Sequence, residues 1–333
     1  MAPTNIEWAD RVWNPVTGCT KVSQGCKNCY AEGVANRFFA TQYPAIVTSS
    51  VHTRPRRFTD VQTHGDRLHE PLKWRKPSRV FVNSMSDLFH KDVPDAFIGR
   101  VFDVMATAQR QTFLILTKRP ARMRELLPTM AARHTAPNRT GWPLPNVHVG
   151  VSVENQQTAD ERIPELLKTP AAIRWVSYEP ALGPVDFDAP HCENCAREHE
   201  QIVPPQDGAG AWCVECDSEA CFGWWLGGDP GLDWIVVGGE SGHGARPFDV
   251  AWARQTVEQC KAAGVPVFVK QLGAVVQAES VDDVADLGWR APDAVEAGTA
   301  PLPFIGSLRN RKGGDMSEWP EDLRVRELPE VRA

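Results

Sequence analysis

Short apolar runs alternate with amphipathic segments through most of the chain. The apolar runs predict buried strands at 80–82, 113–116, 147–151, 173–176, 234–237 and 265–269. Segments with apolar residues at helical spacing predict helices at 95–108, 121–130, 158–168 and 249–263. Apolar strands that alternate with helices pair in parallel, because each helix returns the chain to the end of the sheet where the strand began. The pattern therefore predicts an α/β protein.

Polar or charged groups follow nearly every predicted strand. They are Ser86 and Asp87, Thr117 to Arg119, Ser152 and Glu154, Ser177 and Glu179, Glu240 and Ser241, and Lys270 and Gln271. In a barrel of parallel strands these carboxyl ends meet at one mouth, where such enzymes keep their chemistry. An open doubly wound sheet needs polar groups only beside its switch point. We therefore expect a full or partial TIM-type barrel, and a short strand leading into Asn14 brings the count to about seven strands.

These strand-end residues are the candidates for catalysis and for cofactor binding. Taken singly, Asp87 and Glu154 are explained as caps of the following turn or helix, and Arg119 as the partner of a surface carboxylate. Taken together, they predict a polar pocket. The catalytic candidates are Asp87, Lys118, Glu154, Glu179 and Lys270. The cofactor-binding candidates are Ser86, Ser152, Gly238, Gly239 and Glu240.

Three cysteines, Cys19, Cys26 and Cys29, crowd into one loop near the N-terminus. A structural zinc site is normally closed by four protein ligands, whereas three leave one coordination position open. The loop therefore predicts an open metal site. An iron-sulfur cluster with one free iron fits, and so does zinc completed by a distant His or Asp. The third interpretation is three inert, buried thiols.

A helix is predicted to begin at Tyr30, directly after the last of these cysteines. One face of it carries Ala31, Val34, Ala35, Phe38 and Phe39. Cys26 and Cys29 are then at the helix N-terminus, where the positive end of the dipole favours a thiolate.

A second group of cysteines lies between the strands predicted at 173–176 and 234–237. It consists of two Cys-x-x-Cys pairs, Cys192 with Cys195 and Cys213 with Cys216. Two such pairs at this separation predict a four-thiolate zinc knuckle, with a second iron-sulfur cluster as the alternative and Cys221 as a substitute ligand. We therefore expect a structural insertion at 188–230 within a barrel at 1–275, and a C-terminal extension at 276–333 that packs back on the barrel. Cys260 falls on the apolar face of its helix, so packing explains it.

Several stretches resemble the phage-associated three-Cys-motif family, a largely uncharacterised group similar to radical S-adenosylmethionine enzymes and distantly to spore photoproduct lyase. They are the cysteine loop and residues 82–90, 116–120, 150–154, 238–242 and 270–273. The first cysteine gap, from Cys19 to Cys26, is longer than in radical S-adenosylmethionine enzymes. Gly238, Gly239 and Glu240 resemble the run with which those enzymes hold the methionine amino group, although here the run follows a late strand.

The resemblance implies a 4Fe-4S cluster whose free iron binds S-adenosylmethionine, and reductive cleavage to a deoxyadenosyl radical that abstracts hydrogen from a substrate. It also implies an external electron donor. A nucleic-acid base or nucleotide is the expected substrate, because of the distant similarity to a DNA lyase and the basic clusters at 54–57 and 309–312. The insertion is expected to help select a partner protein. The alternatives are a zinc-only nucleic-acid-binding protein without catalysis and a zinc hydrolase.

The composition of the chain limits these interpretations. The chain has 333 residues, 42% hydrophobic and 23% charged, which is enough for one large domain with additions. Its net charge of -6 argues against a generally basic surface, although a local basic channel remains compatible with it. No secretion signal and no membrane-length apolar stretch are evident, so we expect a cytoplasmic protein with no membrane contact. Nine cysteines in such a chain favour metal ligation over disulfides.

Overall fold

The computed structural model describes residues 4, 6–42, 46–49, 52–134, 141–188, 225–278 and 303–330, together with five two-residue strands between 191 and 223. By its internal contacts the chain divides into two compact units. The first comprises residues 1–151 and 169–172, and the second comprises residues 152–168 and 173–333.

The central element is a seven-stranded sheet in the order β1-β6-β7-β8-β9-β15-β17. Its strands are β1 (Arg11–Trp13), β6 (Ser78–Val82), β7 (Gln111–Thr117), β8 (Val147–Val153), β9 (Ile173–Tyr178), β15 (Trp234–Gly238) and β17 (Val267–Gln271). When the short strands of the other sheets are left aside, strands that are consecutive in the chain are also neighbours in this sheet. The order therefore has no switch point. This order is that of a partial parallel barrel, which confirms the coarse fold prediction.

Five helices accompany these strands in the described part of the chain. They are α1 (Tyr30–Gln42), α2 (Asp95–Thr107), α3 (Pro120–His134), α4 (Gln156–Leu167) and α5 (Val250–Ala263). The positions agree with the predicted helices to within a few residues at each end. α4 begins with a capping box, in which Asn155 and Thr158 satisfy each other's backbone N–H groups. Glu154 is therefore not the cap of this helix. The cap is Asn155, the next residue in the chain.

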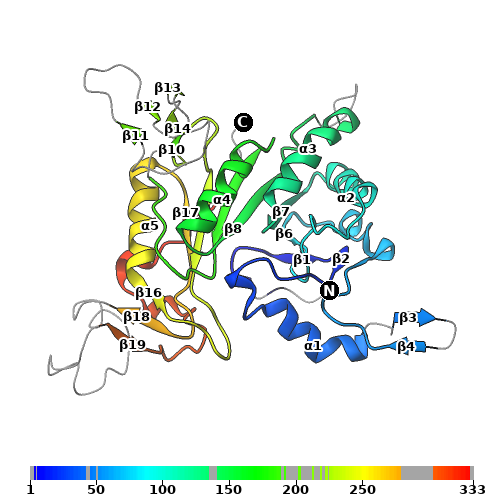
Figure 1. Cartoon of the computed structure of the whole chain (residues 1–333), viewed down its shortest axis with the longest axis horizontal. Helices are drawn as coiled ribbons and strands as arrows, with labels where there is room; N and C mark the ends of the chain where they lie inside the picture. The colour runs from blue at the N-terminus through cyan, green and yellow to red at the C-terminus, as the bar shows by residue number, and fades with distance from the viewer. Residues whose placement is uncertain are drawn as a thin grey trace. The chain divides into compact units, whose positions relative to one another are not determined.

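The first unit is built on β1, β6, β7 and most of β8, with α2 and α3 packed against each other (Figure 1). The registers place Val80 beside Phe113 and Val82 beside Ile115, and all four side chains are fully buried. The Trp13 ring meets the Phe113 ring at 5.7 Å between centroids. These side chains belong to the apolar core of the first unit. Their packing fixes the positions of the strand ends, which carry the candidate residues.

The cysteine loop of the first unit follows β2 (Val16–Thr17), which pairs with β5 (Gln62–Thr63). It includes the short helical turn Gln24–Cys26 and leads into α1, and β3 (Ile46–Ser49) and β4 (His52–Arg54) form a hairpin after α1. Ala31 and Ala35 are buried as predicted, whereas Phe38 is 42% exposed. The buried stripe of α1 is narrower than its sequence suggests.

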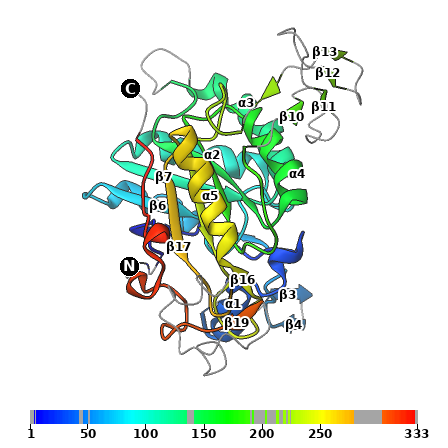
Figure 2. The same cartoon turned by 90° about the vertical axis from the view of Figure 1, so that its left-hand side faces the viewer.

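The second unit contains β9, β15 and β17, with α5 packed along β17 (Figure 2). Its core includes Trp175 and Trp234, whose ring centroids are 5.2 Å apart, and Phe268, which meets Trp234 edge to face. A small sheet of β16 (Phe248–Asp249), β18 (Val276–Ala278) and β19 (Phe304–Gly306) lies at the start of α5.

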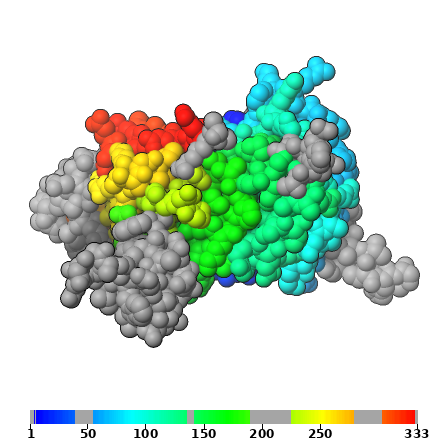
Figure 3. Space-filling model, turned by 90° about the horizontal axis from the view of Figure 1, so that it is seen from above, coloured from blue at the N-terminus to red at the C-terminus, as the bar shows by residue number. Residues whose placement is uncertain are grey.

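A C-terminal segment, residues 313–327, covers the free edge of β17. The backbone N–H of Val269 donates to the Val325 carbonyl at 2.9 Å, and that of Glu327 donates to Val267 at 3.0 Å. The Arg326 guanidinium lies over the rings of both Phe268 and Trp319, at 5.4 and 5.5 Å from the centroids. Figure 3 shows the segment in red against the yellow surface of α5, to which the Arg254–Asp322 ion pair also ties it.

The predicted zinc knuckle falls largely on residues that the structure does not describe, and these include Cys195, Cys216 and Cys221. Cys192 ends β10 (His191–Cys192), which pairs with β14 (Phe222–Gly223). Cys213 ends β12 (Trp212–Cys213), which pairs with β11 (Ile202–Val203) and β13 (Ser218–Glu219). The zinc assignment stays a prediction.

No described helix is both long and apolar enough to cross a membrane.

Trp319 is the anchor of the C-terminal segment, since it is fully buried and its indole N–H donates to the Gly313 carbonyl at 2.9 Å. We predict that Trp319→Ala lowers the free energy of unfolding by roughly 3–5 kcal/mol, because a large buried ring is lost. Ile305→Ala is the control, because Ile305 is 58% exposed and its loss should cost about 0.5 kcal/mol or less. Urea titrations followed by tryptophan fluorescence and circular dichroism measure both, and equal effects would contradict the anchoring role.

Candidate metal centre and strand-end polar sites

The cysteine loop is held by backbone contacts at its first turn. The N–H of Gly18 donates to the Met85 carbonyl at 3.0 Å, and the N–H of Cys19 donates to Phe58 at 2.9 Å. Gly18 has a φ of 91°, and a Cβ there would lie 2.5 Å from the Asp60 carbonyl oxygen. Only glycine therefore fits this turn. The candidate Ser86 supports the same turn, because its hydroxyl donates to the Val16 carbonyl at 2.9 Å.

All three cysteines of the loop are free, half-buried thiols. Cys19 and Cys29 pack with Met85 against the apolar cluster of Ala31, Ala35 and Phe58. Cys29 directly precedes α1, as predicted, and hydrogen bonding from the backbone N–H groups of Glu32 and Ala31 acts to lower its pKa. Burial has the larger effect, however, so the net pKa of Cys29 is raised.

Cys19 lies next to a buried ion pair between Arg119 and Asp87. The Nη1 atom of Arg119 is 2.9 Å from Asp87 Oδ2 and 3.6 Å from the Cys19 sulfur. Burial, helped by the Asp87 charge and opposed by Arg119, raises the pKa of the Cys19 thiol to about 11. The catalytic candidate Asp87 is therefore a partner of the cysteine loop, and Arg119 pairs with a buried carboxylate rather than with a surface one.

Lys118 reaches the same carboxylate through its backbone. Its N–H donates to Asp87 Oδ2 at 3.1 Å, while the Thr117 hydroxyl donates to Oδ1 at 2.8 Å. The end of β7 thus supplies two donors to Asp87 in addition to Arg119. The role of Arg119 at the cysteine loop is not predictable from the sequence. Its position after a strand is apparent, but its contact with a cysteine one hundred positions away leaves no signal there.

The residues of the loop match a metal site in donor type more than in arrangement. Three thiols are the donor set that iron-sulfur clusters and zinc prefer, and the charge of Cys26 acts on the pKa of both Cys19 and Cys29. In the part of the chain that the structure describes, no three His, Cys, Asp or Glu side chains are grouped closely enough to bind a metal ion. The three thiols thus share one loop, and binding one metal centre together requires them to come closer to one another than they are in this structure.

Behind the loop, His64 and Arg56 both contact Thr17. The Thr17 hydroxyl is 2.7 Å from His64 Nε2, and Arg56 Nη2 donates to the Thr17 carbonyl at 2.9 Å. Arg56 is buried and also donates to the Asp60 carbonyl, so it serves the loop rather than a phosphate. This removes one member of the basic cluster at 54–57, and the side chain of Arg54 lies outside the described residues.

In the second unit, the catalytic candidates Glu179 and Lys270 form an ion pair with 2.6 Å between Nζ and Oε1. Both side chains are more than four-fifths buried. The candidate Ser152 donates its hydroxyl to the Glu179 carbonyl at 3.1 Å. The structure thus brings together these three candidates, which lie in or directly after the last residues of β8, β9 and β17.

Two other acidic candidates are occupied by arginines. Glu154 is 1% exposed and pairs with Arg162 on α4, 3.2 Å away. Glu240 accepts two side-chain bonds from Arg246, from Nε at 3.0 Å and from Nη2 at 2.7 Å. Both arginines follow their glutamates by a few residues, so these pairs are local and stabilise the loops after β8 and β15.

Gly239 is required by packing, and Gly238 is closely packed. A Cβ on Gly239 would lie 2.6 Å from the Leu272 carbonyl oxygen and 2.8 Å from Phe248 Cβ. One on Gly238 would lie 3.3 Å from the Gln271 carbonyl oxygen. Close approach of the chain after β17 therefore explains Gly239, whereas a Cβ at Gly238 would need its neighbours to shift by a few tenths of an ångström.

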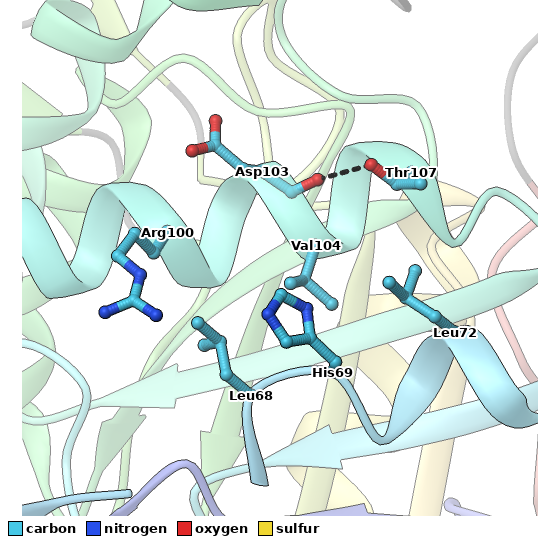
Figure 4. Close-up of a pocket in the computed structure, with 7 residues that line it drawn as sticks. All are labelled: Leu68, His69, Leu72, Arg100, Asp103, Val104 and Thr107. Atoms are coloured by element: carbon cyan, nitrogen blue, oxygen red, sulfur yellow. Dashed lines mark hydrogen bonds between the residues drawn. The ribbon is translucent and has the colours of Figure 1, made fainter. Parts of the chain in front are cut away.

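A shallow pocket of about 270 Å³ lies elsewhere in the first unit, between residues 68–72 and α2 (Figure 4). It is lined by Leu68, His69, Leu72, Arg100, Asp103, Val104 and Thr107. The Asp103 carboxylate is paired with Arg133 at 2.6 Å, and its backbone carbonyl accepts the Thr107 hydroxyl. The pocket contains none of the candidate residues.

These features define an α/β protein of the partial parallel barrel class, with a cysteine-rich loop beside the carboxyl ends of its first strands. The chain belongs to the family described as protein of unknown function DUF5131, whose model matches residues 3–314. No curated protein and no solved structure matches the chain. The family is thus established, and the relation to radical S-adenosylmethionine enzymes stays a prediction.

The pH dependence of stability tests the support behind the loop. Burial, together with the nearby Arg67 and Arg56 charges, lowers the pKa of His64 from 6.5 to about 4. Between these pH values the unfolded chain binds a proton that the folded chain does not, so His64 reduces stability as the pH falls. We expect His64→Gln to show a shallower loss of unfolding free energy than the wild type between about pH 7 and pH 4 in denaturant titrations. Replacement of the exposed His243 is the control, and identical slopes for His64→Gln and the wild type would refute the assignment.

A substitution at Gly239 tests whether close packing is the reason for glycine at this position. We expect Gly239→Ala to lower the unfolding free energy by about 1–3 kcal/mol, because a methyl group there overlaps backbone atoms. Gly33→Ala is the matched control, since a Cβ on Gly33 meets no atom within 4 Å and alanine favours α1 by up to about 1 kcal/mol. Thermal and chemical denaturation should move the two variants in opposite directions. A neutral Gly239→Ala variant would instead leave ligand approach as the reason for glycine.

Proposed function

We propose that this protein is an iron-sulfur enzyme of the radical S-adenosylmethionine type, with a 4Fe-4S cluster on Cys19, Cys26 and Cys29. The observation that carries the proposal is the cysteine loop itself. It presents three free thiols in one half-buried segment, the first beside the Arg119 guanidinium and the third at the start of α1. Three protein thiolates leave one iron of such a cluster open to a small molecule.

When bound, the cluster supplies one-electron chemistry on S-adenosylmethionine, with electrons from an external donor. The chain supplies the surroundings. Phe58, Ala31 and Ala35 pack against Cys19 and Cys29 and exclude water from one side of the loop. Arg119 offsets the negative charge of the thiolates, and Asp87 holds Arg119 in place. The ion pair of Glu179 and Lys270 in the second unit, with Ser152 beside it, is a separate polar site, and the catalytic roles of these residues are a separate part of the proposal.

The proposed substrate is a nucleic-acid base or nucleotide. Its support is the turn at 309–312, in which Arg309, Arg311 and Lys312 are all exposed. The backbone of this turn is fixed, because Asn310 Oδ1 accepts the N–H groups of Lys312 and Gly314. Three cations on a fixed turn suit phosphate contacts. Zinc in the insertion, and a partner protein selected by it, remain part of the proposal.

Anaerobic reconstitution tests the cluster. We expect the wild type to bind about four iron and four sulfide per chain in the loop and to bleach with dithionite. Alanine variants of Cys19, Cys26 and Cys29 should lose this iron, whereas Cys260→Ala, at a fully buried thiol on α5, should retain it. Iron and sulfide analysis with absorption and electron paramagnetic resonance spectra measures the outcome.

Zinc without iron after reconstitution would contradict the proposal and favour a zinc-only nucleic-acid-binding protein, whose binding would weaken steeply with salt. Retention of iron by all three loop variants would place the cluster elsewhere, among the cysteines of the insertion. Reductive cleavage of S-adenosylmethionine by the wild type, measured as released deoxyadenosine with and without oligonucleotides, then tests the reaction type and the substrate class.

A further inference from the structure

Arg119 directs both terminal nitrogens at the cysteine loop and its support. Nη1 donates to Asp87 Oδ2 at 2.9 Å and to the Cys19 sulfur at 3.6 Å. Nη2 donates to the Thr20 carbonyl at 2.9 Å and to the Thr20 hydroxyl at 3.1 Å. The planar guanidinium thus spans the Cys19–Thr20 segment and fixes it against the strand ends.

The position of Arg119 is itself imposed by Asp87. Asp87 is 6% exposed, and its Oδ1 accepts the Phe89 N–H at 3.0 Å as well as the Thr117 hydroxyl. Its Oδ2 accepts the Lys118 N–H together with Arg119. A carboxylate with four donors in fixed directions has no freedom to turn, so the guanidinium paired with it is preorganised.

Thr20 is held from its other side by His90. The His90 ring is fully buried, and its Nδ1 accepts the Asp92 N–H at 3.2 Å. The proton of the neutral ring is therefore on Nε2, which lies 2.8 Å from the Thr20 hydroxyl. Thr20 is thus hydrogen-bonded to both His90 and Arg119. These contacts also fix the backbone of the adjacent Cys19.

The three thiols differ in what surrounds them. Cys19 has a cationic N–H donor on its sulfur, whereas Cys29 has backbone N–H groups and the Cys26 sulfur is 4.0 Å from the Ser23 hydroxyl. Hydrogen bonds and positive charge at a ligand sulfur stabilise the extra electron of a reduced cluster, and so raise its reduction potential. The effect at Cys19 is the strongest of the three, because its donor is charged.

We propose that Arg119 is a positioning residue that fixes Cys19 as a cluster ligand and, through its N–H on that sulfur, raises the reduction potential of the cluster. The inference rests on the proposed function. In the reduction, the cluster gains one electron from an external low-potential donor, for which dithionite serves in the test. No covalent bond forms or breaks, and the Arg119 proton stays on the guanidinium.

The test compares full-length wild type with Arg119→Gln and Arg119→Lys after anaerobic reconstitution. Lysine keeps the charge, but a single ammonium lacks the planar fork that serves Cys19, Thr20 and Asp87 together. Arg79→Gln is the matched control, because Arg79 pairs with Asp10 in the same unit at 3.1 Å and is remote in sequence from the loop. Iron content and the midpoint potential, from dithionite titration followed by electron paramagnetic resonance, are the readouts.

We expect a more negative midpoint potential in Arg119→Gln, an intermediate one in Arg119→Lys, and the wild-type value in Arg79→Gln. Arg119→Lys keeps the test decisive if the glutamine variant does not fold. An unchanged potential in a folded Arg119 variant, with the cluster present in the wild type, would overturn this inference and leave the proposed function intact. Failure of the wild type to form any cluster would overturn the proposed function, and this inference with it.

Discussion

The buried ion pair between Asp87 and Arg119 is the interaction on which the first unit's site depends. Taking two charges out of water is costly, and only a full set of hydrogen bonds compensates for it. Here β6 is followed by the carboxylate, β7 is followed by the guanidinium, and the cysteine loop supplies the remaining acceptors. The pair therefore specifies geometry more than it adds stability. It joins three chain segments that hydrophobic burial alone would leave free to slide.

The electrostatics of Cys19 are a balance between burial and this pair. Burial and the Asp87 charge favour the neutral thiol, while Arg119 favours the thiolate, and the thiol prevails with a pKa of about 11. A metal-free chain at neutral pH thus carries a proton on this sulfur, and ligation to a metal releases it. The expectation that the helix dipole favours thiolates at Cys26 and Cys29 left out burial, which raises the net pKa of Cys29.

The fold was predictable where the chain's pattern is regular. Strands such as β7 and helices such as α2 follow from periodicity, and the polar residues that follow the predicted strands include Glu179, Lys270 and Ser152, which contact one another. What sequence could not supply were contacts that depend on tertiary distance. The Arg119 contact with Cys19 and the crowding at Gly239 both arise from packing between segments, for which spacing along the chain gives no signal. Roles for these residues in catalysis remain predictions.

The cover over β17 has a consequence for the order in which the protein is made. Residues 325 and 327 pair with a strand that ends at Gln271, so a ribosome completes β17 well before its cover emerges. During that interval the nascent chain carries an open strand edge, the kind of surface on which unfinished chains associate with one another. The segment that covers β17 therefore also protects the second unit against aggregation, and slow translation of the residues in between would lengthen the exposure.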